Sequence, residues 1–429
     1  MYKFQKTGMV KEKDSLIPMN KTDFDCCIIL SNYLWNGKSR DQGHSIHYLA
    51  HEMSSNLQKP VFLINLVPFV MLRRYISAFK VFMPGIHTSR GIPLTVINGW
   101  GPDWRDAAHN GEKLPVKRLR KLILRAVHQS GLVKPLLIFT EPTTLPLVKA
   151  LKDQFLLDTS KQGCDIKKDT FPIIWFCSDN FPVGDPRRAG TILKAIDEIG
   201  QTADAICTVS PTLEKVYQTM LPTLLLRNAA DRRFFQQVKT DMAQSGKDPL
   251  GQGIRRKRIV YIGMMNQRID YPALEKAVRE HPEHSFVFIG EERIKPGDDY
   301  YDMYTLIKNS ENTFFTGVKN RQEVAEIFSI CDIGIIPYAM TPFNLSCGPL
   351  KLYEYAAADL PTISTSLPAV EHSRSYAYLV DDGDISAAIE KVVADYDFYK
   401  ERIIAFSKEN TYSDRVQALF NYVKDIVGT

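Results

Sequence analysis

Residues 344–361 combine side chains that are suited to holding a nucleoside diphosphate. A polar loop leads into a helix-forming run that opens at Pro349, and Lys351 adds a positive charge in its first turn. The start of a helix offers free backbone N–H groups and the positive end of the dipole, which favour a phosphate. Glu354 follows on the same face, where its carboxylate can accept hydrogen bonds from two ribose hydroxyls. A capped helix with a surface Lys–Glu pair fits the composition at least as well.

The elements that would position this segment follow from short apolar runs that alternate with amphipathic stretches, a pattern typical of parallel α/β folds. In the front half we expect strands at Cys26–Leu30, Val61–Asn65, Leu94–Ile97, Leu136–Phe139, Ile173–Cys177 and Ala205–Val209. Helices are expected there at His44–Asn56, Lys117–Gln129 and Arg188–Ile199, with Ser210 as the N-cap of a further helix that begins at Pro211.

A second series begins after a stretch rich in Lys, Gln, Gly and Ser. Its expected strands are Ile259–Ile262, Phe286–Ile289, Thr313–Phe315, Ile333–Ile336 and Thr362–Thr365, and its helices are Pro272–Glu280, Arg321–Ile330 and Leu350–Ala358. Two Rossmann-like series in tandem place a cleft between the domains, where the carboxyl ends of both sheets face each other.

The 429 residues are too many for one hydrophobic core, so we expect two domains. The predicted boundaries are a flexible N-terminus over residues 1–22, a first Rossmann-like domain over 23–235, a linker over 236–257 and a second Rossmann-like domain over 258–400. A C-terminal helix over 401–429 is expected to cross back to the first domain.

The charges of the chain are unevenly distributed. Residues 1–170 hold 25 Lys and Arg against 14 Asp and Glu, whereas the remainder holds 29 against 35. A basic front half indicates an anionic partner on that side, either nucleic acid or a membrane leaflet with a diphosphate-bearing lipid. No apolar run reaches the roughly 20 residues that span a bilayer, so no membrane crossing is expected.

The seven cysteines form no Cys-x-x-Cys pair, and most lie in apolar runs. This usage favours a reduced, cytoplasmic protein and disfavours a metal site. No Asp-x-Asp motif is evident where a catalytic metal would be held, so we expect no cofactor and no metal.

The run Pro349-Leu-Lys-Leu-Tyr-Glu-Tyr-Ala-Ala-Ala-Asp-Leu-Pro361 resembles the donor-binding helix of GT-B glycosyltransferases, the group that includes family-four enzymes and enzymes of bacterial polysaccharide synthesis. The family has a Gly where this chain has Asp359, a residue that tolerates the left-handed conformation less well. Further matches follow in the right order: Asp204–Ser210, Leu226–Asp231 with Phe234, Tyr261–Gly263 and Cys331–Pro337. The resemblance covers roughly Asp25 to the C-terminus and is weak over the first 170 residues. It implies an α/β GT-B fold in which the first domain binds the acceptor and the second binds the nucleotide sugar, with a UDP-sugar as co-substrate.

One departure from the family concerns the position eight residues before Glu354. Retaining family-four enzymes usually carry a Glu there, and this chain has Ser346. The chain therefore looks more like the inverting glucuronosyltransferase branch that builds xanthan-type polysaccharides. The resemblance implies that Lys351 neutralises the donor pyrophosphate or a uronate carboxylate. The donor-binding residues that it implies are Gly263, Met264, Tyr338, Ser346, Pro349, Leu350, Lys351 and Glu354.

An inverting transfer needs a base that accepts the proton of the acceptor hydroxyl. Asp179 fits, because it follows an expected strand whose end opens on the cleft, although a turn or helix cap is an equally good interpretation. Asp41 is a rival on the loop after the first strand. In GT-B enzymes that loop enters the cleft, and its candidates for acceptor or cleft contacts are Gly37, Arg40, Asp41 and His44; a polar strand-to-helix loop is the alternative.

Two basic segments of the front half suggest contact with an anionic membrane surface. One contains Lys113, Lys117, Arg118, Arg120, Lys121 and Arg125, and the other places Arg73, Arg74 and Lys80 among large apolar residues. Such mixtures are typical of membrane interfaces, although a solvated basic helix face is also possible. No nucleic-acid motif is present. A monomer at the cytoplasmic face of the cell membrane is expected.

These observations predict a glycosyltransferase that moves a sugar, glucuronic acid among the candidates, from a UDP-sugar to a polyprenyl-diphosphate-linked oligosaccharide with inversion. Exopolysaccharide or cell-surface glycan synthesis is the expected setting. A retaining family-four-type transferase, a UDP-sugar 2-epimerase and a non-catalytic nucleotide-sugar-binding protein remain as alternatives.

Overall fold

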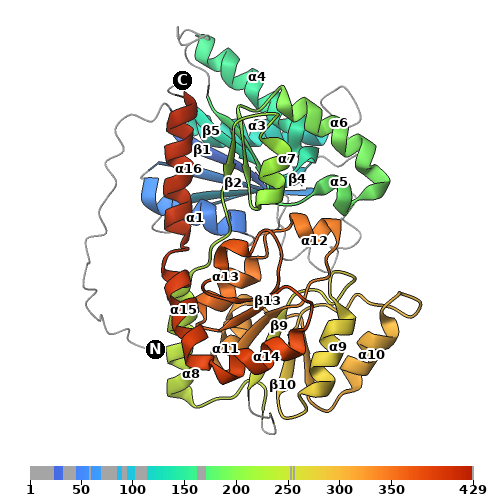
Figure 1. Cartoon of the computed structure of the whole chain (residues 1–429). Coiled ribbons are helices and arrows are strands. Elements are labelled where there is room, and N and C mark those ends of the chain that lie inside the picture. Colours follow the sequence, from blue (N-terminus) through green and yellow to red (C-terminus); the bar gives the residue numbers. More distant parts are fainter. Residues whose placement is uncertain are drawn as a thin grey trace.

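The chain forms two α/β domains, each built on its own sheet, with one domain above the other in Figure 1. A computed structural model describes residues 24–31, 45–57, 59–68, 85–88, 94–101, 114–132, 134–161, 171–251, 254 and 257–427. Two separate core clusters, one for each sheet, account for the buried apolar side chains. The α/β fold with two Rossmann-like domains that the sequence predicts is confirmed.

The first sheet has eight strands in the order β3-β4-β2-β1-β5-β6-β7-β8. Their bounds are β1 Cys26–Ser31, β2 Val61–Pro68, β3 Gly85–Thr88, β4 Leu94–Gly101, β5 Pro135–Phe139, β6 Ile173–Cys177, β7 Ala205–Thr208 and β8 Thr223–Leu225. All neighbours pair in parallel except β3 and β4. Every residue of β1 is buried, as expected for a central strand covered on both faces. All six predicted strands are present, whereas β3 and β8 were not predicted.

The helices of the first domain connect these strands. They are α1 Ser45–Leu57, α3 Leu114–Gln129, α4 Leu145–Lys161, α5 Phe181–Gly184, α6 Ala189–Gly200 and α7 Pro211–Tyr217. Ser210 accepts a hydrogen bond from the backbone N–H of Leu213 through its hydroxyl, which confirms it as the N-cap of α7.

The second sheet has six parallel strands in the order β11-β10-β9-β12-β13-β14. The strands are β9 Arg258–Ile262, β10 Ser285–Ile289, β11 Thr313–Gly317, β12 Ile333–Ile336, β13 Thr362–Thr365 and β14 Tyr378–Val380. The helices are α9 Tyr271–Glu280, α10 Tyr301–Asn309, α11 Arg321–Ser329, α12 Pro342–Ser346, α13 Leu350–Ala357, α14 Ile385–Ala394 and α15 Tyr396–Lys408. The strand order reverses between β9 and β12, and ligands of such sheets bind in the crevice beyond this switch point.

The segment predicted to be a linker, residues 236–257, begins as a helix. Helix α8 (Arg232–Ser245) covers its first ten residues, and Phe235 and Val238 are buried in the second core. The polar composition that suggested a linker belongs to the solvent face of an amphipathic helix. The chain passes from the first domain to the second before α8, over residues 226–231.

The chain returns to the first domain through α16 (Tyr412–Val427), which runs beside α1 in Figure 1. The side chains of Val416, Leu419, Phe420 and Val423 are buried in the core of the first domain. The two crossings are bonded to each other, because Arg415 Nε donates to the carbonyl oxygen of Arg227 at 2.8 Å.

Six of the seven cysteines lie in the described part of the chain, and all six are buried free thiols. Burial raises the pKa of each of these thiols. Among the described helices, none combines the length and apolar character that a bilayer crossing demands.

Candidate active site

A cavity of about 290 Å³ lies where loops of both domains meet. The first domain contributes Asp179, which follows β6, and the other lining residues come from the second domain. The cavity is lined by Asp179, Ile262, Gly263, Arg268, Tyr338, Cys347, Gly348, Pro349, Leu350, Lys351 and Glu354. The loops after β9 and β12 supply several of these residues, so the cavity lies at the switch point of the second sheet.

Lys351 is the buried positive charge of this cavity. Its side chain is in the first turn of α13, only 8% of the residue is exposed, and Nζ donates to the phenol oxygen of Tyr338 at 2.6 Å. The ammonium also lies 4.4 Å from the ring centroids of Tyr261 and Tyr338. The rings of Tyr261 and Tyr338 hold this charge, and no carboxylate in the described part of the chain forms an ion pair with it, so it remains available to an anionic ligand.

The pKa values around Lys351 shift in ways that follow from burial and charge. Burial lowers the pKa of Lys351, and the phenol of Tyr338 opposes the shift. Burial acts to raise the pKa of Tyr338, but the charges of Lys351 and Arg268 outweigh it and lower that pKa. Shifts of this kind in a cleft are common at functional sites.

Gly263 gives Lys351 the space that it occupies. Its φ of +143° is disfavoured for residues with a side chain, and a Cβ there would lie 3.0 Å from Lys351 Nζ and 2.8 Å from the Tyr261 hydroxyl. Gly290 is equally constrained, since its Cβ would meet the carbonyl oxygen of Gly263 at 2.0 Å. Glycine is therefore required at both positions.

Arg268 is a cavity residue that the sequence analysis missed. Its guanidinium lies over the rings of Tyr338 and Phe343 at 4.6 and 4.9 Å, and Nε donates to Asn344 Oδ1 at 2.9 Å. The available signal was a basic residue five positions after Gly263, in the loop that follows the first strand of the second domain. Arg268 and Lys351 together give the cavity two cations.

Glu354 lines the same cavity from the next turn of α13 and is partly exposed. Burial raises the pKa of its carboxyl group, while the charges of Arg321 and Lys351 act in the opposite direction. Arg321 is itself held between the domains, with its guanidinium 4.4 Å from the ring of Tyr48 and 3.9 Å from that of Phe234. The arrangement leaves Glu354 able to accept hydrogen bonds from a ligand.

Asp179 faces the cavity from the first domain. Its carbonyl oxygen accepts from the backbone N–H of Phe181 at 3.1 Å, so the residue lies in a turn. Asn180 occupies the N-cap position of α5, which leaves the carboxylate of Asp179 without a capping role there. The structure thus places a carboxylate of the first domain opposite the two cations of the second.

Ser346 and Met264, both predicted to bind the donor, do not line the cavity. Ser346 is 3% exposed, and its hydroxyl accepts from Asn180 Nδ2 and donates to the carbonyl oxygen of Pro342, both at 3.0 Å. Met264 is 41% exposed on the loop after β9. Ser346 takes part in docking the two domains and the side chain of Met264 faces solvent, so a donor-binding role for these two residues stays a prediction.

The other predicted site residues divide into two groups. Gly263, Tyr338, Pro349, Leu350, Lys351 and Glu354 line the cavity together with Asp179. Gly37, Arg40, Asp41 and His44 lie outside the described residues. The Asp359 that replaces the family's Gly does adopt the left-handed conformation, with φ of +61°, and its carboxylate is bonded to Arg232 and Lys239.

Comparisons with known proteins agree with this fold. Residues 256–396 match the family model "Glycosyl transferases group 1". The "Putative teichuronic acid biosynthesis glycosyltransferase TuaH" of Bacillus subtilis (strain 168) is 30% identical over 138 residues. That match covers 31% of this chain and 34% of the relative, so it spans about a third of the length of each.

Solved structures match over nearly the whole chain. Sucrose-phosphate synthase from Thermosynechococcus elongatus has a TM-score of 0.61 at 15% identity, covering 94% of this chain and 96% of that one. Anabaena HepE in complex with UDP and glucose has a TM-score of 0.58 at 11% identity, covering 94% and 99%. Trehalose-6-phosphate synthase structures, including one from E. coli bound with UDP-2-fluoro glucose, have TM-scores near these values.

Together, the two sheets and the cavity between them define the GT-B class of fold. Within that class, the second domain carries the match to group 1 glycosyltransferases, and both the family model and the Bacillus relative support a transferase.

Proposed function

We propose that this protein is a glycosyltransferase that transfers a sugar from a UDP-sugar to a growing cell-surface polysaccharide. The observation that carries the proposal is the placement of Lys351, Arg268 and Glu354 opposite Asp179 in one interdomain cavity. The Bacillus relative is described as a teichuronic acid biosynthesis glycosyltransferase, and HepE has been solved with UDP and glucose. Both descriptions support this class of reaction.

The donor diphosphate would lie at the start of α13. Lys351 and Arg268 supply two positive charges, and the first N–H groups of the helix have no partner within it, which suits phosphate oxygens. Glu354 would accept hydrogen bonds from the ribose. Because the cations are already fixed by aromatic rings, they stabilise the leaving diphosphate without reorganising.

Inversion would proceed by a single displacement. The acceptor oxygen attacks C1 of the sugar on the face opposite the diphosphate, and its proton passes to the Asp179 carboxylate. The bond from C1 to the diphosphate oxygen breaks, and its electron pair leaves on UDP beside Lys351. Ser346 stands where retaining family-four enzymes usually carry a Glu. Its hydroxyl is directed into the contact between the domains, which supports inversion over retention.

A uronic acid donor, with glucuronic acid as the candidate, would use both cations of the cavity. Lys351 would stay with the diphosphate at the start of α13, and Arg268 would pair with the carboxylate of the sugar in addition to a phosphate oxygen. The contact of Arg268 with Asn344 fixes the direction of its guanidinium, as bidentate recognition of a carboxylate requires.

The acceptor would be a polyprenyl-diphosphate-linked glycan reached from an anionic leaflet. Helix α3 supports this, because it buries Leu119, Ile123 and Val127 and exposes a row of basic side chains. The exposed row is Lys117, Arg118, Lys121 and Arg125. The second basic segment, with Arg73, Arg74 and Lys80, lies outside the described residues, as does Lys113.

Mass spectrometry of the purified protein with a panel of UDP-sugars tests the reaction. Transfer to a lipid-linked acceptor, or slow release of UDP from one donor, is expected. Interconverted sugars would identify an epimerase, and binding without turnover a non-catalytic module. The anomeric configuration of the product, read by NMR, decides between inversion and retention.

Flotation with liposomes tests the membrane contact. We expect binding to vesicles with anionic lipid at low salt and a clear loss for the double reversal Lys121→Glu/Arg125→Glu. The matched control is Lys215→Glu/Lys247→Glu, which reverses two exposed charges elsewhere. Equal flotation of both variants would refute docking through α3.

A further inference from the structure

The turn between α9 and β10 brings together three side chains of the types that bind metal ions in proteins. His281, Glu283 and His284 each offer one atom, and all three atoms lie within 4.8 Å of one another. His281 Nδ1 and His284 Nε2 are both 3.4 Å from the same carboxylate oxygen, Oε1 of Glu283. The turn precedes β10, whose first residue pairs with Arg258 at the start of β9, so it lies at the sheet edge opposite the candidate active site.

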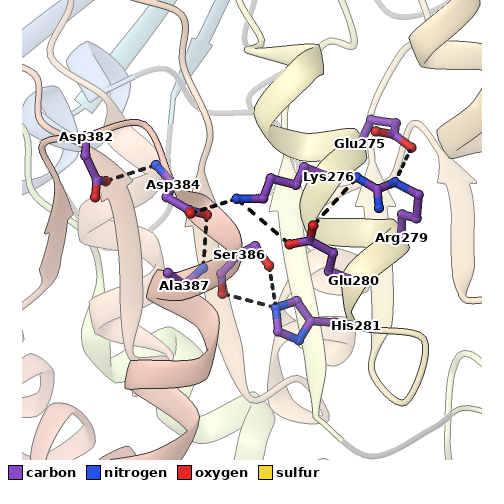
Figure 2. A network of polar contacts seen from close by, with 9 residues as sticks. All are labelled: Glu275, Lys276, Arg279, Glu280, His281, Asp382, Asp384, Ser386 and Ala387. Carbon is purple, nitrogen blue, oxygen red and sulfur yellow. Dashed lines mark hydrogen bonds and ion pairs between the residues drawn. The ribbon is translucent and has the colours of Figure 1, made fainter.

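The hydrogen bonds of His281 determine which ring nitrogen is available. Nε2 lies 3.1 Å from the carbonyl oxygen of Ser386 and 3.0 Å from its hydroxyl, as the two dashed lines in Figure 2 show. A carbonyl oxygen only accepts, so a proton on Nε2 satisfies this contact, whereas the Ser386 hydroxyl can donate or accept. In the neutral ring Nδ1 then has a lone pair, which faces a carboxylate oxygen of Glu283.

A lone pair and a carboxylate repel each other unless a positive charge lies between them. That charge is either a proton on Nδ1 or a metal ion shared by both groups. A shared ion also binds His284 Nε2, the third atom around the same point, whereas protons would put positive charge on two nearly parallel rings whose centroids lie 5.6 Å apart. One divalent ion therefore accounts for all three side chains together.

Ser386, the hydrogen-bond partner of His281, lies at the capped start of α14. Asp384 caps α14 by accepting from the backbone N–H of Ala387 at 3.1 Å, and its other oxygen accepts from Lys276 at 2.7 Å (Figure 2). Ser386 follows within the first turn of α14, and both it and the ring of His281 are buried. Histidines that ligate metals typically donate their second nitrogen to such an acceptor, which sets the tautomer and the ring orientation.

The distances also suit a small ion. In a tetrahedral zinc site, bonds of roughly 2.0–2.2 Å place neighbouring ligand atoms about 3.3–3.5 Å apart. Both distances to Glu283 Oε1 fall in that range. Two imidazole nitrogens with one carboxylate favour zinc or a similar transition ion over magnesium or calcium, which prefer oxygen ligands.

We propose that His281, Glu283 and His284 form a binding site for a divalent transition-metal ion, zinc in the first place, distant from the sugar-transfer site. Water completes the coordination from the solvent side, where the Glu283 side chain is 59% exposed. The bound ion joins the end of α9 to the start of β10, and through Ser386 to α14. Its role is to brace the second domain, so loss of the ion leaves the chemistry of the cavity in place.

Zinc titration of the full chain after chelator treatment tests the site, with a chromophoric chelator as competitor. One equivalent is expected to bind, and cobalt(II) is expected to give visible absorption typical of a site with nitrogen ligands. Glu283→Gln and His284→Gln should each weaken zinc binding by about tenfold or more. Glu283 gives the safer variant, because its own side chain is 59% exposed.

The matched control is His128→Gln. His128 Nε2 also contacts a carboxylate, Asp158 Oδ2 at 3.3 Å, but belongs to no cluster of three ligating side chains in the described part of the chain. Zinc should raise the Tm of the wild type and of this control but not of Glu283→Gln, while donor affinity stays equal in all three. Absence of stoichiometric zinc binding, or binding unchanged in Glu283→Gln, would overturn the proposal and favour protonated histidines.

Discussion

Asn180 Nδ2 of the first domain donates to Ser346 Oγ of the second at 3.0 Å. Ser346 stands where retaining relatives of this family usually carry a carboxylate, and here its hydroxyl joins the two domains beside the cavity. Ser210 and Thr212 extend this contact by donating to the carbonyl oxygens of Ser346 and Leu345 at 2.6 and 2.7 Å. The loop that leads into α13 is therefore tied to the first domain.

Replacement of Ser346 tests this role. Ser346→Ala removes one buried hydroxyl and should lower the free energy of unfolding by about 1 kcal/mol. Ser346→Glu would bury a carboxylate and should cost several kcal/mol more, without creating retaining activity. Urea unfolding measures both effects, with Asn180→Ala completing a double-mutant cycle. Unchanged stability in Ser346→Glu would contradict the assignment.

Asp179→Asn should lower kcat for transfer by about 10²–10⁴-fold, because the amide cannot accept the acceptor's proton. Donor affinity, measured by calorimetry with UDP, should stay near that of the wild type. Asp185→Asn is the control, since it makes the same change six residues further on, outside the cavity. Turnover of Asp179→Asn near the wild-type value would remove Asp179 as the base.

Donor binding should weaken as the pH rises. Burial lowers the pKa of Lys351, so its ammonium is lost at a lower pH than that of an ordinary lysine. Above that pKa, affinity for UDP should fall by at most about tenfold per pH unit. Lys351→Arg keeps its charge and should show a flat profile over the same range. An identical decline in both proteins would exclude Lys351 as the titrating group.

Acid should destabilise the second domain through His372. Burial, with help from the charges of Arg227 and Arg415, lowers its pKa from 6.5 to about 4. Its Nε2 lies 3.2 Å from the hydroxyl of Tyr353, and protonation would place a positive charge in this mostly buried position beside two arginines. Because the folded-state pKa is depressed, the stabilisation is complete above pH 6.5 and is lost as the pH falls through 4, up to about 3 kcal/mol.

His372→Phe is the variant that isolates this effect, since it keeps the ring packed against Phe406. Urea unfolding at pH 7 and pH 4 should show a smaller loss of stability in this variant than in the wild type. Equal losses would assign the acid sensitivity to other groups.

Gly290→Ala should be strongly destabilising, by about 3 kcal/mol or more, because backbone atoms of Gly263 have no space to move away from the new Cβ. Gly297→Ala is the control. It has a similarly positive φ of +93° but no atom within 4 Å, so only the conformational cost of about 1–2 kcal/mol remains. Thermal unfolding compares the two, and equal Tm values would show that the close approach to Gly263 is unimportant.

Local patterns in the sequence predict most of the helices and strands. They also predict the start of the helix that carries Lys351 and Glu354. Each central strand is a short apolar run, and Lys351 and Glu354 share a face because they lie three residues apart on a helix. Contacts between distant parts of the chain were not predictable in this way. The bond of Ser346 to Asn180 spans 166 positions, and that of His281 to Ser386 spans 105.

Arg268 and α8 show two further reasons for error. The side chain of Arg268 is positioned by stacking on Tyr338 and Phe343, which lie some 70 residues later in the chain. The polar side of α8 concealed its buried Phe235 and Val238 within a composition typical of linkers. In both cases tertiary contacts determine the structure, and composition alone does not predict such contacts.

The return of α16 to the first domain sets an order for folding during synthesis. The ribosome completes the first sheet early, yet the four apolar side chains of α16 that close its core emerge only after the whole second domain. Until then the surface that they cover beside α1 stays exposed to other chains. A truncation before Tyr412 would thus leave the core of the first domain incomplete. The expected result is aggregation of the protein during expression rather than loss of sugar binding.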